Sequence, residues 1–147
     1  MTIGKNDSRR GFTLVEIMIV VAIIVVLVAM TIPGILRSRM NANEATAITS
    51  LKTIAWGAIT YRTANSAYPA NLSQMGSTNP PYIDSVLSSG SKQGYGFTLS
   101  GDTGSFNATA VPTTINITGT RTFFTDTSGV IRSASNGTAD SSSPPIE

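Results

Sequence analysis

Hydrophobic and polar positions divide the chain into three stretches with different periods. Between Leu14 and Leu36 almost every position is apolar. From Ile48 to Tyr61 the apolar residues recur at three- and four-residue steps, which is the spacing of one face of an α-helix. From Tyr95 onward apolar and polar residues alternate, which is typical of strands with one buried face. These patterns predict a long helix followed by a small sheet.

The apolar stretch 14–36 is long enough to cross a membrane. As a helix it would span about 35 Å, and the hydrocarbon core of a bilayer is about 30 Å thick. Basic residues frame the stretch on both sides: Arg9, Arg10, Arg37 and Arg39. A secretory signal would have a shorter apolar core followed by a small-residue cleavage site, and no A-x-A pattern follows here. A plain membrane anchor fits the length but leaves Glu16, a carboxylate near the start of the apolar stretch, unexplained. The third interpretation is an anchor whose leader is removed.

The residues around Glu16 form a specific motif. The sequence RRGFTLVEIMIVVAIIVVLVAMTIPGILRSR, residues 9–39, has a basic leader ending in Gly, then Phe-Thr-Leu-x-Glu, then an apolar helix. This motif resembles the N-terminus of type IV pilins and of the pseudopilins of type II secretion. The resemblance implies that a prepilin peptidase cuts between Gly11 and Phe12 and methylates the new amine of Phe12. It also implies a helical homopolymer, a membrane location before assembly, and an inner-membrane assembly platform as a partner.

Glu16 has a physical role to play if many copies of the apolar helix form a bundle. In a single membrane span this carboxylate has no partner, whereas in a bundle it can meet the free amine of Phe12 on a neighbouring copy. Either charge left alone in an apolar core is costly, so a paired carboxylate favours the correctly registered assembly. The alternative is a carboxylate that only snorkels to the edge of the membrane.

Pro33 and Gly34 interrupt the helical pattern. Proline removes a backbone hydrogen bond and clashes with the preceding turn, and glycine lowers helix propensity, so a kink or local melting is expected near residues 29–34. The alternative is that the proline ends the membrane helix. Because the periodicity resumes afterwards, we expect the helix to continue to about Tyr61 or Thr63. Trp56 is expected at an edge of the packed surface rather than in a cofactor site.

The segment 63–94 is rich in Asn, Ser, Pro and Gly and is predicted to be a surface connection. A single-turn helix is expected around Leu72 to Met75. A second short helix, with proline in its first turn, is expected after Pro80-Pro81 and before Gly90. The resemblance identifies this region as the αβ-loop.

The period-two region predicts three or four antiparallel strands. YGFTLS and SFNATAV lie on either side of a Gly-Asp-Thr-Gly turn, and TRTFFTD and GVIRS flank Thr127-Ser128. The apolar face of such a sheet needs a cover, which the stripe on the helix supplies. The polar tail 137–147 is expected to be loose or exposed on a fibre.

The predicted fold class is therefore α+β, a pilin-like fold with a long kinked N-terminal helix packed on a small antiparallel β-sheet. The expected organisation runs from a leader peptide through two halves of the helix to the loop and the β region. The respective ranges are 1–11, 12–36 (the transmembrane or filament-core half), 37–63 (the amphipathic half), 64–94 and 95–147.

Composition narrows the functional classes. The chain has no Cys and no His, which excludes disulfides, Cys or His nucleophiles and the usual zinc ligand sets. Lys and Arg number 10 against 8 Asp and Glu; residues 1–11 hold three of the bases and one of the acids, which leaves seven of each (10 − 3 and 8 − 1). With no basic stripe outside the leader, we expect no dedicated nucleic-acid binding.

The acids that follow the helix are too widely spaced for a catalytic or metal site. They are Asp84, Asp102, Asp126, Asp140 and Glu147. Asp102 and Asp126 lie in turn sequences, where Asp is expected to make local hydrogen bonds. Major pseudopilins have a calcium site in their C-terminal loops, but here acids are few and no two are adjacent. We therefore expect no enzyme activity, no cofactor and no metal.

The resulting hypothesis is a structural subunit of a type IV pilus, located in the bacterial inner membrane as a prepilin and in an extracellular or periplasmic filament after assembly. The close alternative is the major pseudopilin of a type II secretion system. Absence of the family's usual C-terminal disulfide weakens the first, and absence of an acid cluster weakens the second. A filament that conducts electrons is disfavoured, since only Phe12, Trp56 and Tyr61 supply aromatic rings on the helix. A membrane-anchored enzyme lacks a site.

Overall fold

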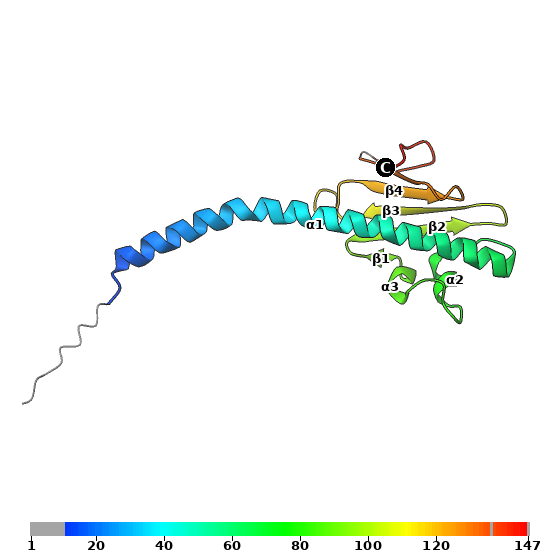
Figure 1. The fold of residues 1–147 in the computed structure, drawn as a ribbon, viewed down its shortest axis with the longest axis horizontal. Coiled ribbons are helices and arrows are strands. Elements are labelled where there is room, and N and C mark those ends of the chain that lie inside the picture. The colour runs from blue at the N-terminus through cyan, green and yellow to red at the C-terminus, as the bar shows by residue number, and fades with distance from the viewer. Residues whose placement is uncertain (1–10, 136, 147) are drawn as a thin grey trace, which may run out of the picture. The chain divides into compact units, whose positions relative to one another are not determined.

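The computed structural model of the protein describes residues 11–135 and 137–146, so that the predicted leader, apart from Gly11, lies outside the described residues. The chain separates into two compact units that meet between Leu36 and Arg37, called here the N-terminal unit and the C-terminal unit. The elements follow in the order α1 (Leu14–Asn65), α2 (Leu72–Gly76), α3 (Ser85–Ser88), β1 (Ser91–Lys92), β2 (Tyr95–Gly101), β3 (Phe106–Pro112), β4 (Thr122–Asp126) and β5 (Ile131–Ala134) (Figure 1). The α+β fold class is confirmed.

Helix α1 ends at Asn65, two residues beyond the later of the two predicted ends. The last turn is closed by Ser66, whose backbone has φ of 60° and whose N–H donates to the Arg62 carbonyl at 2.8 Å. A residue with positive φ just past the end is a common helix stop. The helix runs without interruption through Pro33 and Gly34, so residues 29–34 are not melted in this structure. The predicted kink stays a prediction.

The strands form one antiparallel sheet in the order β1-β2-β3-β4-β5. The hairpins β2–β3 and β4–β5 have the turns that the sequence predicts. The strand that was not predicted is β1, which falls inside the expected loop. It has only two residues, too few for an alternating pattern, and it exists because Gln93 and Gly94 adopt positive φ and turn the chain back onto β2.

The core of the C-terminal unit lies between α1 and one face of the sheet (Figure 1). The predicted helical stripe is confirmed: Leu51, Ile54, Ala55 and Ala58 are buried, and Ile48 and Tyr61 pack partly against them. The inward positions of β2 and β4 supply large side chains. Those of β3 include the fully buried alanines Ala108 and Ala110, which leave room for the helix to approach the centre of the sheet.

The short helices α2 and α3 are each started by a side-chain cap. Asn71 accepts from the Gln74 N–H at 3.0 Å, which confirms the single-turn helix predicted around residues 72–75. Asp84 accepts from the Leu87 N–H at 2.6 Å and starts α3 at Ser85. The prediction of proline in the first turn is therefore wrong. Pro80-Pro81 lie upstream, because Asp as an N-cap satisfies a free helical N–H, which proline cannot do.

A buried carboxylate joins α1 to the connection between β3 and β4. Glu44 is 4% exposed, and its Oε1 accepts from the Thr120 N–H and the Thr120 hydroxyl at 2.8 Å each. Its Oε2 accepts from Arg121 Nε at 2.8 Å. Next to it, Asn43 Nδ2 donates to the Thr118 carbonyl at 2.9 Å. Burial alone would raise the pKa of Glu44, but the hydrogen bonds from Thr120 and Arg121 outweigh it and hold that pKa below its usual value.

The C-terminal tail is ordered along β5, so the first of its two predicted states, a loose tail, is wrong, and exposure on a fibre stays a prediction. The Ser133 N–H donates to the Pro144 carbonyl at 3.0 Å, and the Ile146 N–H donates to the Ile131 carbonyl at 2.9 Å. Ala139 is buried. The polar, proline-containing sequence concealed this arrangement, because prolines that cannot donate to a sheet can still accept from its edge strand.

Candidate functional site

The motif residues lie at the start of the N-terminal unit. Gly11, Phe12 and Thr13 precede α1, and the Phe12 side chain is exposed. A Cβ added to Gly11 would meet nothing within 4 Å. The fold therefore does not need glycine at this position, and a requirement for glycine would have to come from a molecule that approaches the chain here.

Glu16 and Thr13 cap the first turn of α1 reciprocally. The Glu16 N–H donates to Thr13 Oγ1 at 3.2 Å, and the Thr13 N–H donates to Glu16 Oε2 at 3.4 Å. This is the capping box, in which Thr and Glu three residues apart satisfy each other's backbone N–H groups. Our interpretation of the sequence missed it, although Thr-x-x-Glu before an apolar stretch is its signature. Glu16 thus has a local role in addition to the one predicted for it.

The carboxylate of Glu16 is exposed and still has capacity to accept. Among residues 11–135 and 137–146, the ion pairs join Lys92 to Asp84 and Arg121 to Glu44. Neither involves Glu16. The described part of the subunit brings Glu16 together with Thr13, and any cationic partner would have to come from elsewhere.

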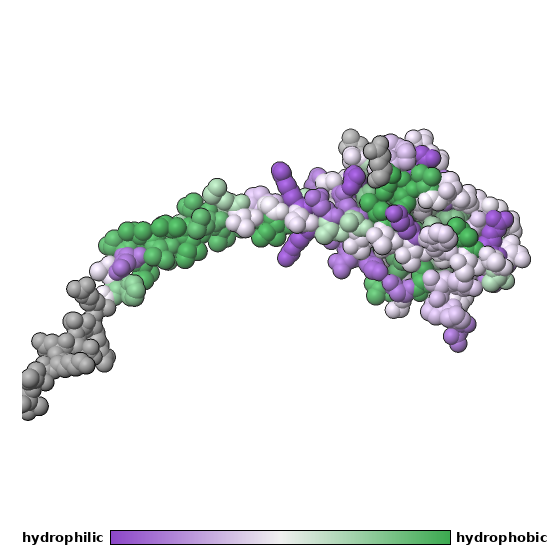
Figure 2. Space-filling model, viewed as in Figure 1, coloured by the Kyte–Doolittle hydropathy of each residue, from purple (hydrophilic) through white to green (hydrophobic). Residues whose placement is uncertain are grey.

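The apolar surface that follows Glu16 is uncovered. Figure 2 shows it as a band of hydrophobic residues along the first part of α1, and the exposed fractions of the large apolar side chains between Phe12 and Leu36 range from 49% to 79%. The helix is long and apolar enough to cross a membrane, with a mean hydropathy of 3.0 over its most apolar window. Soluble monomers rarely expose so large an apolar area, so this surface is a contact surface for lipid or for other chains.

The acids of the C-terminal unit act within their own loops. Backbone N–H groups of Ser105 and Gly104 donate to Asp102 and lower its pKa, and the Ser128 N–H donates to Asp126 at 2.8 Å. Both predicted turn roles are confirmed. Asp140 accepts from Ser142 and Ser143, which also lowers its pKa. Within the described residues, no three acidic, His or Cys side chains gather as a metal site would require.

Comparison with known proteins places the motif in a family. Residues 6–32 match the family described as the prokaryotic N-terminal methylation motif. The chain is 29% identical over 91 residues to the type II secretion system core protein G of Escherichia coli K12, a match that covers 61% of this chain and 63% of that protein.

Two pilins match shorter stretches. Identity to the type IV major pilin protein PilA of Myxococcus xanthus is 45% over 49 residues, which covers 33% of this chain and 22% of the relative. Identity to the type IV wide pilus major component PilA4 of Thermus thermophilus is 36% over 64 residues, which covers 44% and 49%. Each of the three matches spans less than two thirds of the relative's own length.

The methylation motif, the capped and exposed apolar helix and the helix-on-sheet unit agree with these matches. The N-terminal part of this chain matches the prokaryotic N-terminal methylation motif, and the chain is similar both to type IV pilins and to type II secretion core proteins G.

Proposed function

We propose that this chain is the structural subunit of a type IV pilus and polymerises through its N-terminal helix. The observation that carries the proposal is the uncovered, membrane-length apolar surface of α1 with a capped carboxylate at its start. Before assembly a bilayer would cover this surface, and in a filament the same surface of other copies would cover it. The chain has a structural rather than a catalytic role.

Processing would create the positively charged partner that Glu16 lacks in the described part of the chain. A prepilin peptidase of the inner membrane would cut between Gly11 and Phe12 and methylate Phe12, whose amine then carries a positive charge near neutral pH. The open space around Gly11 would let a protease approach the backbone closely. The new amine lies four residues before Glu16, near enough along the chain for staggered copies to pair the two groups.

Assembly would take place at the inner membrane, with an assembly platform extracting subunits from the bilayer. The finished filament would be extracellular for a pilus or periplasmic for a pseudopilus. The alternative function, major pseudopilin of a type II secretion system, is favoured by the match to core protein G, which covers more of the chain than the pilin matches do. The Glu16–Phe12 pair and the helix bundle are common to both functions.

The test is to isolate surface filaments from the native host and identify their main subunit by mass spectrometry. We expect filaments composed of this chain, beginning with N-methylated Phe12. Deletion of its gene should remove them and leave protein secretion intact. Loss of secretion without loss of surface filaments would assign the chain to a pseudopilus instead. Filaments that retain residues 1–11 would contradict the processing step.

A further inference from the structure

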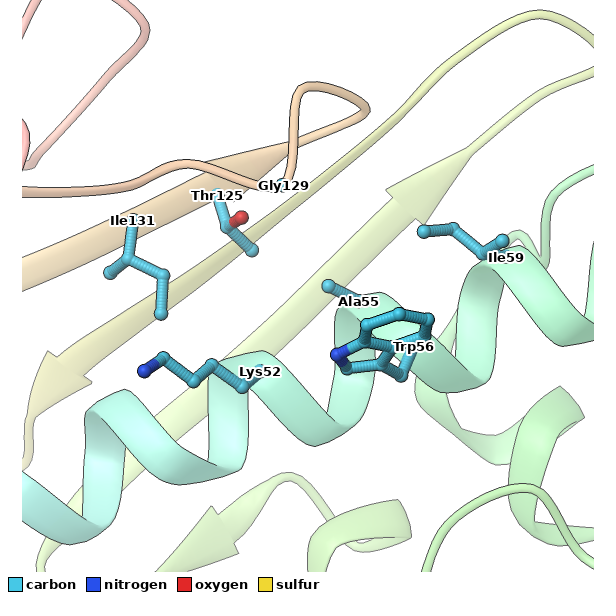
Figure 3. A pocket seen from close by; sticks show the side chains of 7 residues that line it. All are labelled: Lys52, Ala55, Trp56, Ile59, Thr125, Gly129 and Ile131. Atoms are coloured by element: carbon cyan, nitrogen blue, oxygen red, sulfur yellow. The ribbon is translucent and has the colours of Figure 1, made fainter.

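The C-terminal unit has an apolar cavity beside its exposed tryptophan. The cavity has a volume of about 120 Å³ and lies between α1, which contributes Lys52, Trp56 and Ile59, and the β4–β5 hairpin, which contributes Thr125 and Ile131 (Figure 3). An apolar cavity of about 150 Å³ holds a benzene molecule, so this one is suited to a single side chain. Trp56 stands at its edge with 72% of its surface exposed.

One residue that lines this cavity has a buried polar atom without a partner in the described part of the chain. Thr125 is fully buried, and its Oγ1 forms no hydrogen bond within the described residues. Figure 3 shows the Thr125 side chain on the hairpin side of the cavity, opposite Ala55 and Trp56 of the helix. Buried hydroxyls are nearly always satisfied. Because Thr125 Oγ1 is itself buried, an incoming side chain would meet only the apolar part of Thr125.

The same unit presents two isoleucines on the connection between β3 and β4. Ile115 is 64% exposed and Ile117 is 66% exposed, in a stretch whose other members are Thr, Asn, Gly and Arg121. Two exposed β-branched side chains two positions apart give this loop a small apolar surface.

The loop that presents these isoleucines is held rigidly. The Ile117 and Thr118 N–H groups both donate to the Thr114 carbonyl, and the Asn116 N–H donates to the Gly119 carbonyl at 2.9 Å. Its end is tied to α1 by Asn43 and by the buried Glu44. A loop that is already ordered loses little conformational entropy on binding, which favours its use as a contact.

The isoleucines and the cavity lie at different levels of α1. The loop is tied at residues 43–44 and the cavity opens at residues 52–59, a mean separation of 12 residues or about 18 Å along the helix. A contact between two different patches of identical chains is heterologous, and it propagates as an open filament when each copy is also displaced along the axis, so that no ring can close. This is the symmetry that the proposed function requires.

We propose that the cavity beside Trp56 receives Ile115 or Ile117 from a second copy of the chain, displaced by about 18 Å along the helix direction. The inference rests on the proposed function and names a specific contact between neighbouring C-terminal units. The sec-butyl side chain fills the apolar space, and Trp56 is covered by the incoming loop. The contact is separate from the bundle of N-terminal helices.

The absence of cysteine from the chain allows a direct test by disulfide cross-linking in filaments. Two double variants, Ile115→Cys with Ile59→Cys and Ile117→Cys with Ile59→Cys, carry one thiol on the loop and one at the cavity. Mild oxidation should convert at least one of them into a ladder of covalent multimers. The control pair, Val86→Cys with Ile59→Cys, replaces an exposed residue of similar shape on α3 and should stay monomeric.

Single variants test the heterologous geometry. Ile59→Cys alone and the loop cysteine alone should each stay monomeric, and filaments assembled from a mixture of the two should stop at dimers. Cross-linking of a loop cysteine to itself would overturn the proposal, because it would mean that two loops meet. A ladder from the control pair would overturn it as well.

Trp56 supplies a second readout, since it is the one tryptophan of the chain. Its fluorescence should shift to shorter wavelength and lose access to a soluble quencher when the chain assembles. The double variant Ile115→Ser, Ile117→Ser should leave Trp56 accessible in the filament. Equal quenching of Trp56 in subunits and in wild-type filaments would overturn the proposal.

Electron microscopy of the cysteine-free parent separates this inference from the proposed function. Filaments without a ladder would reject only the loop-and-cavity contact. If the parent forms no filaments at all, the proposed function fails and this inference fails with it.

Discussion

The two units of this chain are built on one helix, yet their residues are constrained by different neighbours. In the N-terminal unit the large apolar side chains are exposed along the whole length from Phe12 to Leu36. In the C-terminal unit the corresponding residues of α1 are buried against the sheet. The subunit's own structure therefore explains the sequence of the second half of α1. The sequence of the first half, beyond its capping box, is explained by molecules outside the subunit.

The largest expected effect of this difference is at Glu16. The variant Glu16→Gln keeps an acceptor for the Thr13 N–H, so the helix cap should survive, but it removes the charge that would pair with the Phe12 amine. Leaving one partner of a buried pair alone costs about 3 to 5 kcal/mol. Repeated in every subunit, this should abolish filaments or sharply reduce them.

Thr13→Ala is the matched control, because it removes the cap and keeps the charge. Filaments should be counted by electron microscopy, with prepilin cleavage and subunit levels measured by immunoblot. Glu16→Ala should behave like Glu16→Gln and leave membrane insertion unharmed. Normal filaments from Glu16→Gln would show that Glu16 acts only as a helix cap.

The second prediction separates the two units physically. A chain lacking residues 1–39 should be a soluble monomer, because it no longer carries the exposed apolar surface. It retains the whole core, including Leu51, Ile54 and the inward side of the sheet. Analytical ultracentrifugation and circular dichroism should report a folded monomer. An unfolded product would mean that the C-terminal unit depends on the N-terminal one.

The third prediction concerns the hydrogen bonds that Glu44 accepts from Thr120 and Arg121 within the C-terminal unit. The variant Glu44→Gln should destabilise this unit by about 1 to 3 kcal/mol. The amide has one oxygen instead of two, so it cannot accept from both Thr120 and Arg121 as the carboxylate does. Urea unfolding of the soluble truncated chain measures the change. Lys52→Gln, on the exposed face of the same helix, should change stability by less than about 0.5 kcal/mol.

The same carboxylate makes the stability of this unit depend on pH. The pKa of Glu44 is lower in the folded chain than its usual value of 4.5, so the unfolded chain takes up the proton first as the pH falls. The stabilisation is complete above about pH 4.5 and is lost as the pH falls through the folded pKa. The Glu44→Gln variant should show a weaker loss of stability in that range. An unchanged pH dependence would contradict the assignment.

The smallest effect is expected at the cap of α3. Asp84→Ala removes the acceptor for the Leu87 N–H and the ion pair with Lys92, and N-cap losses of this kind cost about 1 kcal/mol. Asp84→Asn should retain most of the stability, because Asn is an equally good N-cap. Urea unfolding of the three chains is the measurement, and equal losses from both variants would point to the ion pair instead.

The sequence predicted the elements whose signals are periodic. The stripe from Ile48 to Tyr61 and the strands on either side of Thr127-Ser128 were found as expected, because burial against one neighbour imposes a regular spacing. Two elements without a periodic signal, strand β1 and the tail along β5, were missed. The two residues of β1 are too few for any period, and the tail along β5 is held by backbone groups that every sequence carries.

The candidate site was predictable where it depends on motif residues. Gly11, Phe12 and Glu16 stood out because a charge beside an apolar stretch is unusual, and residues 6–32 match the methylation motif. Glu44 was not identified, since its partners Thr120 and Arg121 are 76 and 77 residues away in the chain. The cavity beside Trp56 was hidden for the same reason.

The tail along β5 affects how readily many copies of this chain would aggregate through the edges of their sheets. An exposed edge strand is a template for pairing with another copy, and ordered aggregation would compete with any other way of packing many subunits together. Here Pro144 and Pro145 lie along that edge and bring no N–H groups with which a further strand could continue the ladder. On the opposite side of the sheet, the two-residue β1 pairs only with Tyr95 and Gly96 of β2. The β5 edge is thereby protected from amyloid-like pairing when many copies of the chain are packed together.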